Sequence, residues 1–205
     1  MTSQYDSTVT ERLLARLDQG DRSALESLVA LHRVYLKRLI DLRMTDELRS
    51  RVDPSDVVQE TQLVVSQRID DFLRRRTTTF RIWLRRTAME KLVDVRRQHL
   101  AEKRSVRREV RLSDASSLAI ARHLLAGRPS EAMQRKELAQ QVRSSIQRLS
   151  DLDREVLLLR YVEELSNAEV AELLNIDADT ARKRHGRAIR RLGEQLSDSG
   201  ISLKE

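Results

Sequence analysis

Apolar residues recur along this chain at intervals of three and four positions, the spacing that places them on one face of a helix. The first such segment can begin at Asp21 or Ser23, and its pattern continues toward Leu48. Its apolar face comprises Leu25, Leu28, Val29, His32, Leu36, Leu39 and Ile40. The pattern therefore predicts a long amphipathic helix in this part of the chain.

Two further helices are predicted by their start signals. Asp53 can cap the free amides of a first turn, and Pro54 fits the first helical position, where no amide donor is needed. This helix continues to about Phe72, and Thr79 caps the next one. The third helix has an apolar face of Phe80, Trp83, Leu84, Thr87, Ala88, Leu92 and Val95, with Arg81, Arg85 and Arg86 outside it. Trp83, the only tryptophan, is more typical of this core face than of a base-stacking position.

The periodicity weakens between Leu112 and Ser130, where Gly127 and Pro129 occur, and we interpret this stretch as a partly helical linker. Two helices follow, from about Glu131 to Leu149 and, capped by Ser150, through Val162. The predicted organisation is a first domain at residues 1–111, a linker at 112–130 and a second domain at 131–205.

A helix-turn-helix is predicted near the end of the chain. Ser166 and Glu169 form a capping box that starts a short helix. Asn175 tolerates the left-handed backbone that ends a helix, and Asp177 can cap the following one. The second helix runs from about Ala178 to Leu196, with Ala181, His185, Ala188, Leu192 and Leu196 on its inner face.

The opposite stripe of this second helix is basic and comprises Arg182, Lys183, Gly186, Arg187 and Arg190. Arginine can fork onto the two acceptors of guanine in the major groove, and either cation can hold a phosphate. Gly186 costs a helix about 1 kcal/mol, so its presence suggests that something such as a base edge approaches the backbone closely there. The alternative is a basic amphipathic helix on a membrane or partner, but the caps, turn and small inner residues favour the helix-turn-helix.

Composition agrees with an all-α fold and a polyanionic partner. Charged residues make up 35% of the 205 positions and aromatic residues 3%, with only two prolines and five glycines to interrupt helices. The net charge is +7, and the basic residues gather in two zones, 74–111 and 180–193, separated by the acidic stretch 151–179. Single charge runs are often only solvated helix faces, but two on amphipathic helices indicate two anion-binding surfaces.

Several classes of function are disfavoured. The chain has no cysteine, and its four histidines show no metal-ligand spacing, so we expect no metal and no cofactor. No glycine-rich phosphate loop or nucleophile arrangement points to an enzyme. The N-terminus is polar, and no apolar run approaches the roughly 20 residues of a membrane span, so we expect a cytoplasmic protein without membrane insertion.

Three motifs, in this order, resemble one family, the short extracytoplasmic-function (ECF) type of the bacterial RNA polymerase sigma factors. They are Asp53-Pro54-Ser55-Asp56-Val57-Val58-Gln59-Glu60-Thr61, then Phe80, Trp83, Leu84 and Ala88 followed by Asp94 and Arg97, then Glu164–Ala171 with Asp179–Ala188. The residues of the last motif are similar to those of a branch of the family associated with planctomycetes. The resemblance implies sigma region 2 in the first domain and region 4 in the second.

The resemblance also implies sites. The edge formed by Asp53, Asp56, Gln59, Glu60 and Leu63 would bind core RNA polymerase, where carboxylates pair with a partner's arginines. On spacing alone, these acids could equally complement the helix dipole. The minus-10 promoter element would be read and melted by Arg74, Arg75, Arg76, Thr78, Thr79, Arg81, Arg85, Arg86 and Arg97. The minus-35 element would be read by Arg182, Lys183, Gly186, Arg187 and Arg190.

Two departures from the family pattern fall in the minus-10 group. Glu90 stands where the family usually has asparagine, and Arg76-Thr77-Thr78-Thr79 stands where it often has R-G-x-S. Promoter specificity is therefore expected to be unusual. The resemblance also implies that the linker runs toward the RNA-exit path, with the basic run Lys103 to Arg111 extending the first domain or beginning the linker.

The favoured function is a sigma factor, which has no catalysis of its own and directs core RNA polymerase to promoter DNA. The alternative is a stand-alone helix-turn-helix regulator, which would need a ligand pocket or a dimer interface that the basic first domain does not suggest. An enzyme acting on nucleic acid is the third hypothesis. Members of the family are often held inactive by an anti-sigma protein, and the sequence leaves open whether this chain has such a partner.

Overall fold

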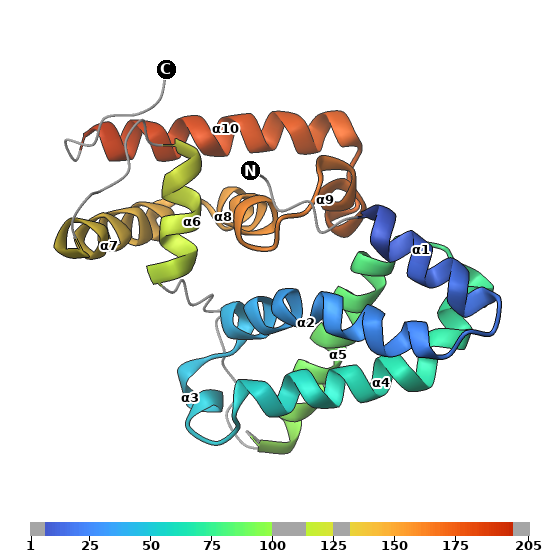
Figure 1. The fold of residues 1–205 in the computed structure, drawn as a ribbon. Helices are drawn as coiled ribbons and strands as arrows, with labels where there is room; N and C mark the ends of the chain where they lie inside the picture. The colour runs from blue at the N-terminus through green and yellow to red at the C-terminus, as the bar shows by residue number, and fades with distance from the viewer. Residues whose placement is uncertain (1–6, 100–113, 125–131, 199–205) are drawn as a thin grey trace. The chain divides into compact units, whose positions relative to one another are not determined.

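The computed structural model describes residues 7–99, 114–124 and 132–198, and every regular element in these ranges is helical (Figure 1). This confirms the predicted all-α class. The chain divides into two compact units, Met1–Arg111 and Leu112–Glu205, each with its own core. None of the described helices is long and apolar enough to cross a membrane.

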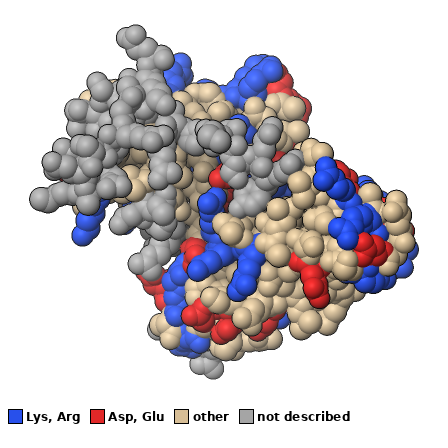
Figure 2. Space-filling view, viewed as in Figure 1, with Lys and Arg blue, Asp and Glu red and all other residues tan. Residues whose placement is uncertain are grey.

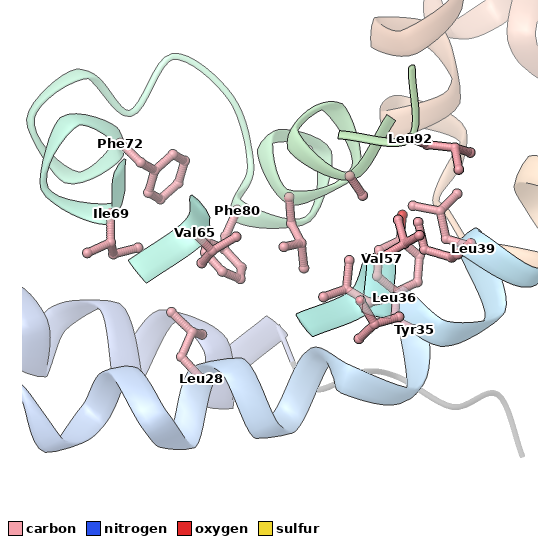
Figure 3. Close-up of a cluster of buried hydrophobic side chains, with 14 of the residues drawn as sticks. Leu28, Tyr35, Leu36, Leu39, Val57, Val65, Ile69, Phe72, Phe80 and Leu92 are labelled. Atoms are coloured by element: carbon pink, nitrogen blue, oxygen red, sulfur yellow. The ribbon is translucent and has the colours of Figure 1, made fainter. Parts of the chain in front are cut away.

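The first unit is a helical bundle in which one helix packs against three others. Its elements are α1 (Ser7–Asp18), α2 (Ser23–Arg43), α3 (Asp46–Arg49), α4 (Pro54–Arg75) and α5 (Phe80–His99). Helix α2 packs against α1, α4 and α5, and α4 packs against α5. Figure 3 shows how the apolar side chains of these helices, among them Leu28, Leu36, Val65 and Phe80, point into one shared core.

The bundle differs from the sequence prediction at two places. Helix α1 was not predicted, although Leu13, Leu14 and Leu17 bury one face of it against the core. Helix α2 ends at Arg43 rather than continuing toward Leu48, because Met44 adopts an extended conformation with ψ 124°. That bend allows both Met44 and Leu48 to be buried, and the loss of helix is compensated by this burial.

Helix α4 begins as predicted and ends one turn later than predicted. The Asp53 carboxylate accepts a hydrogen bond from the Ser55 amide at 2.7 Å, which lowers the pKa of Asp53. The helix continues past Phe72 to Arg75. Arg76 then closes it in the left-handed region, with φ 35°. Arg74 and Arg75 therefore belong to the last turn of α4, beyond the helix end near Phe72 that the sequence predicts.

The second unit contains α6 (Asp114–Leu124), α7 (Ala132–Arg148), α8 (Asp151–Leu157), the π-helical turn η1 (Leu158–Val162), α9 (Asn167–Leu174) and α10 (Ala178–Ser197). Ser150 caps α8 as predicted, accepting from the Asp153 amide. The segment interpreted as a linker contains α6, which packs against α7 and η1. Helix α10 packs against α7, α8 and α9.

Candidate polymerase and nucleic-acid interfaces

The helix-turn-helix is built by local hydrogen bonds that the sequence predicts. The Ser166 hydroxyl accepts from the Glu169 amide at 3.1 Å, and the Glu169 carboxylate accepts from the Ser166 amide at 2.8 Å. Asn175 ends α9 in the left-handed region with φ 52°. Asp177 caps α10 by accepting from the Thr180 amide at 2.8 Å. These bonds fix the angle at which α10 leaves the turn.

The inner face of α10 packs closely on the rest of the unit. Ala181, Ala188, Leu192 and Leu196 are buried, and the two alanines leave room for the neighbouring helices. His185 is half-buried, and its Nε2 lies 2.9 Å from the Tyr161 hydroxyl of η1. Burial, and secondarily the charge of Arg160, lowers the pKa of His185. This shift favours the neutral imidazole, which joins η1 to α10.

The outer face of α10 exposes all five residues of the predicted stripe, Arg182, Lys183, Gly186, Arg187 and Arg190. A Cβ added at Gly186 would meet no atom within 4 Å, so nothing in the described chain requires glycine there. Asp179 pairs with Arg182 and, at 2.7 Å, with Lys183, while Glu194 lies 3.7 Å from Arg190. Among the described residues, Arg187 has no acidic partner.

Arg191 lies outside the predicted stripe, and its guanidinium pairs with Asp153 of α8. The Asp153 side chain is only 9% exposed, so removing Arg191 would leave a nearly buried carboxylate unpaired. Arg191 therefore anchors α10 to α8. This pairing could not be found from helical spacing because the two residues are 38 positions apart.

The predicted polymerase-binding edge lies along the N-terminal half of α4. Asp56 and Gln59 are exposed, and Leu63 is 60% exposed, the most exposed of the large apolar side chains among the described residues. Asp53 is exposed but serves as the helix cap. Glu60 lies 2.6 Å from Lys91 of α5 and is therefore already paired within the unit. The edge that remains available combines one carboxylate, one amide and one apolar side chain.

The residues predicted to contact the minus-10 element differ in their ion-pair partners and in their exposure. Arg76 lies 2.5 Å from Asp18 and 3.9 Å from Glu11, both on α1. Arg74 pairs with Asp71 in its own helix, and Arg75 is exposed. Thr78 and Thr79 lie in the short connection to α5, where the Thr79 hydroxyl accepts from the Ile82 amide at 3.4 Å. This last bond confirms the predicted cap of α5.

Helix α5 places its arginines in three different environments. Arg81 was predicted to lie outside the apolar face, but it is half-buried and its guanidinium sits 4.7 Å from the centre of the Tyr35 ring. Arg85 is half-buried and Arg86 is exposed. Arg97 lies 3.8 Å from Asp94. Of these four, Arg86 and Arg97 are therefore the most accessible to DNA.

Two residues singled out in the sequence are explained by their contacts. Trp83 packs against Phe72 and Phe80, with ring centres 4.8 Å and 5.6 Å apart, so its place in the core is confirmed. Glu90 lies 3.4 Å from Arg68 of α4, so its charge is opposed within the unit. Figure 2 shows other acidic side chains lying among basic ones on the visible face of the first unit. The basic run Lys103 to Arg111 lies outside the described residues.

No described group of three or more histidine, cysteine or acidic side chains could hold a metal ion. The arrangement instead consists of a cationic helix on a rigid helix-turn-helix and a second helical unit with a cation-rich end. Such an arrangement is typical of proteins that bind DNA.

Comparison with known proteins indicates the class of this protein. Residues 139–192 match the family model of sigma-70, region 4. The chain is 26% identical over 191 residues to the ECF RNA polymerase sigma factor SigW of Bacillus subtilis (strain 168), covering 92% of this chain and 97% of the relative. It is 28% identical over 181 residues to the ECF RNA polymerase sigma-E factor of Haemophilus influenzae (strain ATCC 51907 / DSM 11121 / KW20 / Rd), covering 87% and 90%.

A solved structure, CnrH in complex with the cytosolic domain of CnrY, matches the fold with a TM-score of 0.53 and 24% identity, covering 95% of this chain and 99% of that one. The region 4 match and the two relatives of nearly equal length support membership of the chain in the sigma-70 family, in its ECF class. The likeness to a planctomycete branch stays a prediction.

Proposed function

We propose that this chain binds core RNA polymerase and directs it to promoters, without catalysis or a cofactor of its own. The observation that carries the proposal is the exposed cationic stripe of α10, held on a helix-turn-helix within the segment that matches sigma-70 region 4. A helix of this kind can enter the major groove with its N-terminal half. Because polymerase and chromosome share the cytoplasm, we also propose that the chain acts there.

The polymerase contact is assigned to the α4 edge. Asp56 and Gln59 offer acceptors and a donor, and Leu63 supplies an apolar anchor that is 60% exposed in the free chain. In protein interfaces a few residues carry most of the binding energy, and charged groups fix the orientation of the partners. Asp53 and Glu60 would act less directly, since one caps the helix and the other is paired with Lys91.

The minus-10 contact is assigned to the end of the first unit where α4 gives way to α5. Arg75, Arg86 and Arg97 would hold phosphates of the opened strand. Arg74 and Arg76 could exchange their carboxylate partners for phosphates, because both pairs are partly exposed and therefore weak. Thr78 and Thr79 would contact bases or sugars. Arg81 and Arg85 would contribute less, since both are half-buried.

The minus-35 contact is assigned to α10. Arg187 is the strongest candidate for a base reader, because it is exposed and unpaired among the described residues and follows the open Gly186 position. Arg182, Lys183 and Arg190 would join it after leaving their acidic partners. An anti-sigma protein is a further proposed partner, because the chain shares the fold of CnrH, whose structure contains the cytosolic domain of CnrY.

Run-off transcription tests the proposal. Purified core polymerase would be assayed on a pool of genomic promoter fragments with and without the full chain. We expect defined transcripts only when both are present. If the free chain bound one operator tightly and specifically and did not associate with polymerase, the stand-alone regulator would be the correct function instead.

A further inference from the structure

Asp179 is the acidic side chain closest to the predicted base readers of α10. It lies on the first turn of the helix, and its two carboxylate oxygens hold different cations. One oxygen pairs with Arg182, and the other lies 2.7 Å from Lys183 Nζ. The three side chains are 48–72% exposed, so the cluster lies at the surface that would face DNA.

These pairs contribute little to the stability of the fold. Exposed ion pairs three and four residues apart on a helix are weak, because water screens the two charges and the long side chains lose freedom when they are held together. A strong competing anion can therefore replace Asp179 at Arg182 or Lys183. The structural need for an acid at the start of α10 is met by Asp177, whose carboxylate accepts from both the amide and the hydroxyl of Thr180, at 2.8 Å and 2.6 Å.

The consequence for DNA binding is asymmetric. When Arg182 and Lys183 turn to phosphates, Asp179 is left as an unpaired anion beside the polyanionic backbone, which is unfavourable. At a suitable base step, the same carboxylate can accept from a cytosine N4 amino group while arginine or lysine binds guanine O6 and N7. Asp179 therefore weakens binding to any DNA that is held through its phosphates alone. The repulsion is offset only where a base offers this carboxylate a hydrogen-bond donor.

We propose that Asp179 is a specificity-determining residue of the upstream-element contact, a proposal that rests on the function proposed above. Its effect is to lower affinity for unrelated DNA more than affinity for the chosen element. Repulsive features of this kind are a common source of specificity.

The test uses holoenzyme reconstituted from the full chain and core polymerase. The probes are a duplex selected by the wild-type holoenzyme from a library randomised in the upstream element, and a scrambled duplex of equal length. Asp179→Asn should raise affinity for the scrambled duplex about tenfold or more and change affinity for the selected duplex little, so that the ratio between the two duplexes falls about tenfold. Asp179→Glu should keep most of that ratio. Unfolding temperatures would show that all variants are folded.

Glu194→Gln is the matched control, because it makes the same change of charge on α10 but frees Arg190 at the other end of the helix. It should raise affinity for both duplexes alike and keep their ratio. If Asp179→Asn behaved in the same way, Asp179 would be only one charge among others and the proposal would be overturned. If the wild-type holoenzyme selected no upstream element at all, the proposed function itself would fail.

Discussion

The basic residues of the two units are neutralised in different ways. In α10, Arg182, Lys183 and Arg190 pair with acids three or four residues away on the same helix. In the first unit, Arg74 and Arg97 also have partners within their own helices, but other pairs join different parts of the bundle: Arg76 reaches Asp18 on α1, and Arg22 pairs with Asp70 on α4. The charge pattern of the predicted stripe of α10 is therefore determined within one helix, whereas that of the first unit depends in part on the folded bundle.

This difference explains what the sequence could predict. The caps at Asp53, Ser166 and Asp177, the left-handed Asn175 and the two faces of α10 depend on residues a few positions apart, so local rules find them. The contacts of Arg76, Arg81, Glu90 and Arg191 join residues 22 to 65 positions apart. No spacing rule predicts which distant helix will lie beside them.

Among the elements, helix α1 was not predicted, although Thr10, Leu13, Leu14 and Leu17 follow helical spacing and offered a local signal for it. The π-helical turn at the end of α8 follows a normal helical pattern in sequence and is set by packing against α6 and α9. Polymerase and DNA contacts remain predictions, because they depend on partners that the chain itself does not contain.

The largest effect is expected at Arg187, which lies on the exposed basic stripe of α10 and has no acidic partner among the described residues. Arg187→Ala should weaken binding of the holoenzyme to its upstream element about 10- to 100-fold, the loss of one bidentate base contact, with little change in stability. Duplex titration at constant salt measures it. Arg148→Ala, which removes an exposed charge from α7 in the same unit, is the control. Equal losses for both variants would mean that only net charge matters.

Acid should destabilise the first unit through His32, whose Nε2 lies 3.0 Å from the Thr10 hydroxyl. Burial, and secondarily the charge of Arg81, lowers the pKa of His32 from 6.5 to about 4. The unfolded chain therefore binds the extra proton first, so this stability is present above pH 6.5 and is lost as the pH falls toward 4. We expect a loss of about 2 kcal/mol between pH 7 and 5.

Urea unfolding of the full chain at pH 7 and pH 5 measures this loss. The His32→Gln variant is the control, since it removes the titrating group and keeps the carboxylates that also respond to acid. The difference between the two pH values should be smaller in the variant. An equal pH dependence in both proteins would show that His32 is not the responsible group.

Leu63 tests whether the exposed edge of α4 is a docking surface. Leu63→Ala should weaken binding to core polymerase about tenfold, the effect of losing one apolar anchor. Val34→Ala on α2 is a matched control, because Val34 is 54% exposed and Leu63 is 60% exposed. Fluorescence titration of labelled chain with core polymerase measures both. Equal affinity of the Leu63 variant and wild type would remove Leu63 from the interface.

The smallest effect concerns the stability contributed by a cross-helix pair. Arg76→Gly removes the pairs with Asp18 and Glu11 but relieves a left-handed residue with φ 35°. The relief is worth about 1 kcal/mol, and exposed pairs contribute up to about 1 kcal/mol, so the free energy of unfolding should hardly change. Arg74→Gly, inside the last turn of α4, should cost about 1 kcal/mol by comparison. A much larger loss at Arg76 would show that the pairs hold α1 in place.

The central claim is that two cationic regions of one chain become promoter-specific only on core polymerase. It is tested most directly by measuring, at one salt concentration, the affinities of the free chain and of the holoenzyme for one promoter duplex and its scrambled counterpart. We predict that the free chain binds both duplexes weakly and almost equally, and that the holoenzyme prefers the promoter by a hundredfold or more. Tight and selective binding by the free chain, unchanged by core polymerase, would contradict the account.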